Sequence, residues 1–216
     1  YPANDDFLKR HHDTNALHYW ANWCLCNIAA KMAIGIVTDR RDIYNEGIDH
    51  LQTGDTNGRL RRAIYHDYAP DYNFAQWQES GRDQGHTLMC VGLMGVICQL
   101  AWSQGDDFFA YDDNLFLRAC EYAACCNYTN ETVPYTTYIW QKQSQWGYPI
   151  PEEQTTLGGG KWIKRAIWAL PYYHYKGIKN ISNDNLKYTK IATEYVGIEG
   201  GGGYYDANSG GYDVLG

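Results

Sequence analysis

A polar stretch, QWQESGRDQGH, occupies residues 76–86 and leads directly into the apolar sequence TLMCVGLMGVICQLAW. It contains three amides, two acids, an arginine, a serine and a histidine. Side chains of these kinds bind carboxylates and hydroxyls, and they transfer protons. The glycines at positions 81 and 85 let the backbone turn and approach a ligand closely. The stretch therefore predicts a loop that ends in a helix start and forms the wall of a binding or catalytic site.

Individual side chains of this stretch suit different tasks. Arg82 and His86 are candidates for holding a substrate carboxylate, and Gln84 is a candidate for binding hydroxyls. Asp83 lies just before the apolar run, where an acidic residue caps a helix. As a structural alternative, Arg82 pairs with Glu79 or Asp83 and merely supports the loop. For the two acids we favour that alternative.

A second stretch, RLRRAIYHDYAP at residues 59–70, combines arginines with a tyrosine. A tyrosine has a reference pKa of about 10, so it acts as a base only where nearby positive charge lowers that value. Arg62 lies six positions before Tyr68, and Arg61 lies seven before it. The spacing by itself favours surface arginines at a helix end and a core position for Tyr68.

Further candidates come from NALHYW at residues 15–20 and from VPYTTYIW at residues 133–140. The first adds Asn15 as a substrate-binding candidate and His18 as a proton acceptor, although a lone histidine at a helix start is more often structural. The second adds Tyr138 and Trp140, whose rings suit stacking on sugars as well as packing in a core.

The elements that position these residues are predicted to be helices. Apolar periodicity predicts them over residues 17–38, 41–54, 83–105, 114–129, 161–177 and 183–197. Some are apolar nearly all round and others are amphipathic, which indicates buried inner helices with outer partners. Long loops such as residues 128–160 argue against a simple bundle. We therefore predict an all-α fold, an (α/α) toroid that forms an incomplete barrel of helical hairpins.

We expect residues 1–216 to form a single domain, and a fragment that lacks N-terminal and C-terminal parts of the toroid. The net charge of −7 argues against nucleic acid as a partner, since no basic face dominates. No segment is predicted to span a membrane. Neither the seven cysteines nor any other ligand cluster indicates a metal or another cofactor, and nothing indicates the oligomeric state.

Asn-x-Ser/Thr sequons occur at Asn127, Asn130 and Asn180. Two of them fall in one loop-like stretch, CCNYTNETVPY. Because such sites are glycosylated on the secretory route, they favour a secreted, extracellular glycoprotein.

Four segments resemble the alginate lyase family of polysaccharide lyases, and within it a branch that cleaves alginate or glucuronan. They are HYWANWCLCNIAAKMAIGI, YHDYAPDYNFAQWQESGRDQGHTLM, VPYTTYIW and GGGGYYDANSGGYD, with QESGRDQGH the most specific part. The resemblance covers nearly the whole chain. It implies an (α/α) toroid and β-elimination, with an acidic polysaccharide as substrate.

Such a lyase removes the proton at C5 of a uronate and expels the oxygen at C4. The site must neutralise the carboxylate, supply a base for C5 and supply an acid for the leaving oxygen. The resemblance places Tyr68 at the family's catalytic tyrosine. It places Arg62 at the catalytic arginine, with Arg61 as the alternative that otherwise binds substrate.

The base is less directly indicated. The family's histidine aligns with Leu17, and His18 lies one position further along, so we take His18 as the candidate base. His11, His12 and His66 are alternatives, and Tyr68 acting as both base and acid is another. That last possibility suits mannuronate or glucuronate, whose C5 proton and C4 oxygen lie on the same side.

Two other functions compete with a lyase. A glycoside hydrolase on a similar helical toroid would use Glu79 and Asp83 as its acid and base. A carbohydrate-binding remnant would hold the polysaccharide without cleaving it.

Overall fold

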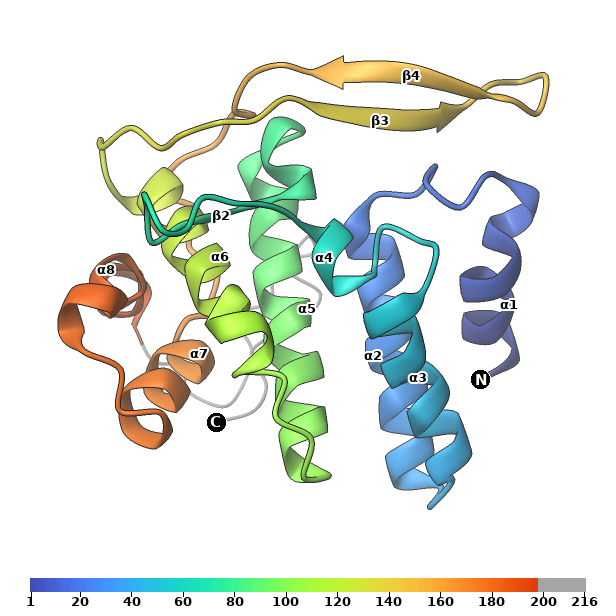
Figure 1. Ribbon diagram of the computed structural model, residues 1–216, viewed down its shortest axis with the longest axis horizontal. Coiled ribbons are helices and arrows are strands. Elements are labelled where there is room, and N and C mark those ends of the chain that lie inside the picture. Colours follow the sequence, from blue (N-terminus) through green and yellow to red (C-terminus); the bar gives the residue numbers. More distant parts are fainter. Residues whose placement is uncertain (198–216) are drawn as a thin grey trace.

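The computed structural model describes residues 1–197 of the chain. Helices and short sheets alternate along it (Figure 1). In chain order the elements are α1 (Pro2–Arg10), α2 (Ala21–Val37), α3 (Arg41–Thr53), α4 (Leu60–Ala63), β1 (Ile64–Asp67), β2 (Ala75–Trp77), α5 (Gln84–Ser103), α6 (Tyr111–Tyr128), β3 (Tyr138–Gln143), β4 (Pro149–Gln154), α7 (Ala169–Tyr173) and α8 (Lys187–Val196).

The predicted all-α toroid is wrong. Residues 1–197 are about 57% helical, and two antiparallel two-stranded sheets among them, β1–β2 and β3–β4, make this part of the chain a mixed α and β fold. The sequence gives little indication of these strands. Strands β1 and β2 have four and three residues, too few for a clear alternating pattern. Strand β4 reads PIPEEQ, and its two prolines and two acids are untypical of a strand.

Several helices lie close to their predicted positions. The periodicity over residues 17–38, 41–54 and 83–105 corresponds to α2, α3 and α5. The predicted helix over 161–177 is wrong in its first half, since α7 begins at Ala169. Two helices, α1 and α4, lie outside the predicted ranges. The second has four residues, too few for a periodic pattern.

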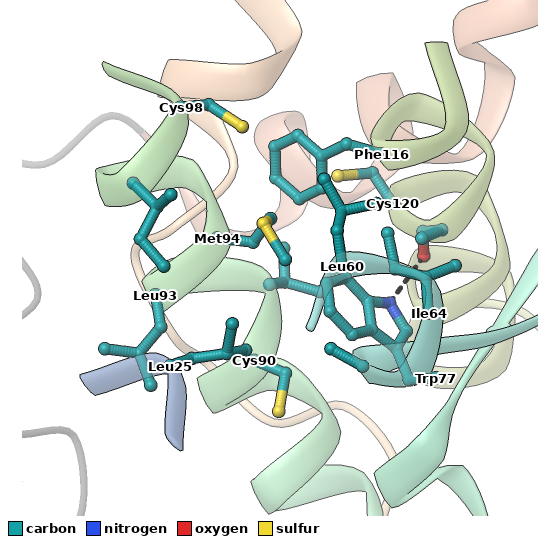
Figure 2. Close-up of a cluster of buried hydrophobic side chains, with 14 of the residues drawn as sticks. Leu25, Leu60, Ile64, Trp77, Cys90, Leu93, Met94, Cys98, Phe116 and Cys120 are labelled. Atoms are coloured by element: carbon teal, nitrogen blue, oxygen red, sulfur yellow. Dashed lines mark hydrogen bonds between the residues drawn. The ribbon is translucent and has the colours of Figure 1, made fainter. Parts of the chain in front are cut away.

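Helix α5 runs through the centre of the fold, with α2 on one side and α6 on the other (Figure 1). Its residues Cys90, Leu93, Met94 and Cys98 pack in a continuous apolar core (Figure 2). Trp77 enters the same core from β2, and its indole nitrogen donates a 2.9 Å hydrogen bond to the carbonyl of Ala119 in α6. Within residues 1–197, α5 alone has the length and apolar composition of a membrane span. A buried core helix has these properties too.

Helices α2 and α3 approach each other closely at Gly35. A Cβ atom on Gly35 would lie 2.5 Å from the backbone nitrogen of Tyr44, which is closer than real contacts allow. At Gly95, in the middle of α5, a Cβ would meet only side chains, Leu170 at 3.5 Å and Phe116 at 3.9 Å. The first glycine therefore sets a helix–helix distance, and the second leaves room for a methyl group.

This contrast predicts opposite effects for two matched substitutions. We expect Gly35→Ala to lower the free energy of unfolding by about 1–3 kcal/mol, because α2 and α3 must separate. We expect Gly95→Ala to raise it by about 0.5–1 kcal/mol, because alanine favours a helix interior. Urea denaturation of both variants measures the difference. Equal destabilisation by the two would contradict the close approach.

Candidate functional site

The predicted site residues gather at one end of the fold. The N-terminal ends of α2 and α5, the β1–β2 sheet and the 3₁₀ turn Gln78–Gly81 lie there, beneath the β3–β4 hairpin (Figure 1). The polar stretch at residues 76–86 connects β2 to α5 and so passes through the middle of this region.

The first part of the polar stretch caps helix α2. The side-chain oxygen of Gln78 accepts a 2.9 Å hydrogen bond from the backbone nitrogen of Ala21, and Glu79 accepts one of 3.1 Å from Asn22. Both capping side chains are fully buried. A helix start carries backbone N–H groups without partners inside the helix, and these two acceptors satisfy two of them. Gln78 and Glu79 therefore connect the turn at residues 78–81 to the start of α2.

The second part caps helix α5 in the same way. Asp83 accepts from the backbone nitrogen of His86 at 2.8 Å, and its other oxygen lies 2.6 Å from Nδ1 of that histidine. The predicted cap is confirmed. Gln84 is buried, donates to the carbonyl of Ser80 at 3.3 Å and accepts from Asn127 at 3.1 Å. Gln84 thus joins α5 to α6, and His86, about one-third exposed, is occupied by Asp83.

Arg82 is the side chain of this stretch that combines positive charge with partial exposure. Its guanidinium lies 3.2 Å from Glu79 and 5.3 Å from the ring centre of Trp20. The favoured alternative of an Arg82–Glu79 pair is thus present, and the stacking on Trp20 adds a cation–π contact. With 29% of its side chain exposed, Arg82 still faces solvent.

The surroundings of Glu79 shift the pKa of its carboxyl group strongly. Burial raises its pKa from 4.5 to about 7, against the opposing effects of Arg82 and of the hydrogen bond from Asn22. A carboxyl group that is buried away from water stays protonated unless nearby positive charge stabilises its ionised form. Glu79 is therefore only partly ionised at neutral pH.

Tyr68 follows β1 and lies at the edge of this region. Its hydroxyl donates to the side-chain oxygen of Gln76 at 2.6 Å and lies 3.0 Å from the hydroxyl of Thr136. The ring of His66 is 4.6 Å away between centroids. Burial raises the pKa of Tyr68, while the hydrogen bonds with Thr136 oppose the shift. Because its direct partners are uncharged, Tyr68 is suited to donate a proton.

An ion pair fixes the backbone just before Tyr68. Asp67 receives two hydrogen bonds from the guanidinium of Arg118 in α6, at 3.0 and 2.8 Å, and a weaker contact from Arg61 at 3.7 Å. Arg61 pairs with Asp112 as well. Bidentate pairing of this kind holds a strand end in one orientation. Arg61 is accordingly committed to carboxylates of the protein.

His18 holds the β3–β4 hairpin in place. Its Nδ1 accepts a 2.8 Å hydrogen bond from the backbone nitrogen of Gln143, and its carbonyl accepts one of 2.7 Å from the indole of Trp140. A neutral imidazole that accepts at Nδ1 carries its proton on Nε2. Burial lowers the pKa of His18, and Lys142 adds to this effect. Its free nitrogen thus offers a donor, where the predicted role requires an acceptor.

Asn15 also serves the hairpin. Its amide donates to the carbonyl of Gln141 at 3.1 Å and to the side chain of Gln143 at 2.8 Å. Together with His18 it connects the residues before α2 to strand β3, more than 100 positions later.

Aromatic rings form a continuous row between the hairpin and the β1–β2 sheet. Consecutive ring centroids along this aromatic row lie 4.6–6.4 Å apart. In spatial order its members are His18, Trp140, Trp20, Tyr138, Tyr65, His66 and Tyr68. Tyr138 and Trp20 are buried, whereas the others are partly exposed. The row brings together four predicted site residues, and Arg82 stacks on its centre.

Three members of the site are missing from the sequence predictions. Gln76 and Thr136 hold the Tyr68 hydroxyl, and Tyr65 joins Tyr138 to His66. Pro70 and Asp71 between two β-prone runs are the available signal for the turn that brings Gln76 to Tyr68. No local pattern predicts the contact with Thr136, which comes from 68 positions away.

The three sequons differ in their surroundings. Asn130 and Asn180 are exposed, as glycosylation requires. The prediction for Asn127 is wrong, because this residue lies fully buried in α6 and its amide donates to Gln84 and to the carbonyl of Ala123. A glycan on that amide is incompatible with the fold.

Comparison with known proteins identifies no relative. No family model matches the chain, and neither the curated proteins nor the solved structures contain a match. Among residues 1–197, no three histidine, cysteine or acidic side chains are grouped so that they could hold a metal ion.

The buried Glu79 predicts a specific pH dependence of stability. Because its folded pKa of about 7 exceeds the ordinary 4.5, the free energy of unfolding falls as the pH rises between these values, by roughly 3 kcal/mol in total. Glu79→Gln keeps an acceptor for Asn22 and should remove this component. Denaturation across this pH range measures it against the exposed control Glu194→Gln. A Glu79→Gln profile that parallels the parent protein's would contradict the buried acid.

The sequons predict a pattern of glycan masses. In protein secreted from a eukaryotic host, Asn130→Gln and Asn180→Gln should each remove one glycan, while Asn127→Gln should remove none. Intact mass spectrometry of the three variants gives the answer. A mass loss on changing Asn127 would contradict its position in the core.

Proposed function

We propose that the protein is a polysaccharide lyase that cleaves a uronic-acid polymer, alginate or glucuronan, by β-elimination. The observation that carries the proposal is Tyr68, a half-buried side chain whose hydroxyl is held by Gln76 and Thr136 and whose ring contacts that of His66. The resemblance to alginate lyases in the sequence around Tyr68 and Arg82 supports the same activity.

In this mechanism Tyr68 donates the proton to the leaving oxygen at C4. Burial raises its pKa, so the hydroxyl is protonated at neutral pH and available as an acid. The hydrogen bonds with Gln76 and Thr136 fix the oxygen in position while leaving the side chain partly exposed.

His66 is the base for the C5 proton in this proposal. It takes the place of His18, whose Nδ1 is occupied by Gln143. His66 and Tyr68 lie two positions apart at the end of β1, and their rings are in contact. An acid and a base on one side suit a uronate whose C5 proton and C4 oxygen are on the same side. Glucuronate and mannuronate have this arrangement, so we propose them in preference to guluronate.

The rest of the aromatic row would support the sugar chain. Tyr65, Trp140 and His18 are partly exposed and present rings on which sugars stack. Arg82, stacked on Trp20 and partly exposed, supplies the positive charge that neutralises the uronate carboxylate beside C5.

The hydrolase alternative finds less support. Glu79 is fully buried and caps α2, and both oxygens of Asp83 are engaged by His86. A hydrolase needs both carboxyl groups to reach the scissile bond.

The assigned acid predicts the effect of a minimal substitution. Tyr68→Phe removes one oxygen, and we expect the rate on glucuronan to fall on the order of 10²–10⁴-fold. Tyr72→Phe is the matched control, since Tyr72 is an exposed neighbour whose ring centroid lies 6.5 Å from that of Tyr68. The ultraviolet absorbance of the unsaturated product gives the rates. Full activity of Tyr68→Phe would overturn the role of this residue.

Replacing His66 and His18 in separate variants distinguishes the roles that we propose for them. His66→Gln should abolish most of the activity, because it removes the proposed base. His18→Gln should act mainly through the hairpin, with a lower thermal unfolding temperature and a smaller loss of rate. Steady-state kinetics together with thermal unfolding distinguish these effects. A larger loss of kcat from His18→Gln would return the base to His18.

A further inference from the structure

Among residues 1–197, two arginines form no ion pair, whereas most of the others do. Arg10, Arg40, Arg41, Arg61, Arg82 and Arg118 each lie within 4.0 Å of a carboxylate. Arg59 and Arg62 form no ion pair and no side-chain hydrogen bond with any residue that the structure describes. In a chain of net charge −7, this absence of a partner is notable.

The two guanidinium groups are also partly withdrawn from water. The Nε atom of Arg59 and the Nη1 atom of Arg62 are buried without a hydrogen-bond partner. The residues lie one helical turn apart, since the backbone nitrogen of Arg62 donates to the carbonyl of Arg59 at 2.7 Å. Burial lowers the pKa of Arg62, and the like charge of Arg59 adds to this effect. Unpaired buried donors of charged groups are costly unless a ligand satisfies them.

The surroundings connect this pair of arginines to the aromatic row. Tyr138, a buried member of the row, is one of the groups that raise the pKa of Arg62. Tyr138 lies in hydrogen-bond range of Asn57, two positions before Arg59. One carboxylate, Asp55, is within electrostatic reach of Arg62 but forms no ion pair with it, and its own close contact is Nε2 of His11 at 3.7 Å.

We propose that Arg59 and Arg62 form an anion site for the carboxylate of a uronate residue bound along the aromatic row. This inference rests on the proposed function for the identity of the ligand. Two guanidinium groups from residues one helical turn apart offer the forked donors that match a carboxylate. The site would make the enzyme prefer a polymer with successive charged residues, and Asp55 would moderate its affinity.

The test measures binding separately from cleavage. Isothermal titration calorimetry uses the Tyr68→Phe variant, a six-residue oligoglucuronate, and the same oligomer with its carboxylates reduced to alcohols. On this background we compare Arg59→Gln/Arg62→Gln, Asp55→Asn and the control Arg40→Gln. Arg40 precedes α3, a helix about 20 Å long, and is paired with Asp42.

We expect the double variant to bind the oligoglucuronate at least tenfold more weakly, Asp55→Asn to bind it more tightly and Arg40→Gln to be unchanged. The reduced oligomer should bind all variants with the same low affinity. Thermal unfolding of the unliganded double variant should occur at the same or a higher temperature, because unpaired charges are removed. Unchanged affinity of the double variant, or its failure to fold, overturns the proposal.

Two further outcomes separate the inference from the function on which it rests. If the parent protein does not cleave glucuronan but the arginine pair is still required for binding, the lyase assignment fails and the anion site stands. If the parent protein cleaves glucuronan and the double variant has an unchanged KM, the site fails and the lyase assignment stands. Inorganic sulfate that binds as tightly as the oligomer would overturn the assignment to a uronate.

Discussion

The structure depends on the meeting of two buried helix starts. Helices α2 and α5 both begin at the same end of the fold, and each brings backbone N–H groups that have no partner within the helix. The polar stretch satisfies both: Gln78 and Glu79 accept from α2, and Asp83 accepts from α5. Most of the polar side chains in this stretch therefore serve to cap the two helices. Arg82 remains as its partly exposed charge.

The capping contacts between the polar stretch and the two helix starts also position the residues that we propose for catalysis. Strand β2 leads into the capped turn and pairs with β1, so Gln76 and Tyr68 are held relative to the helix starts. Trp20 ends the segment before α2 and supports both Arg82 and Trp140. The aromatic row therefore follows from the same constraint. The stretch QESGRDQGH at residues 78–86 builds the site, and proton transfer is assigned to His66 and Tyr68, which precede it.

The sequence predicts the helices well where apolar periodicity is long, as in α2, α3 and α5, because burial of these helices depends on their own side chains. It also predicts the Asp83 cap, which is a local interaction. It fails for the β3–β4 hairpin, whose position depends on Asn15 and His18 from more than 100 residues earlier. The same long-range contact changes His18 from a predicted base into a support of the hairpin, and burial against Gln84 removes Asn127 from the glycosylation sites.

Because β-elimination and hydrolysis both cut the polymer, the central claim rests on the kind of end that each cut creates. The decisive measurement incubates the protein with glucuronan and, separately, with alginate. In each incubation, ultraviolet absorbance measures the unsaturated product and a colorimetric assay measures the new reducing ends. A lyase produces one unsaturated end for every new reducing end, and we expect that ratio with glucuronan or with mannuronate-rich alginate. New reducing ends without the absorbance would contradict β-elimination, and binding of both polymers without any new ends would contradict an enzyme.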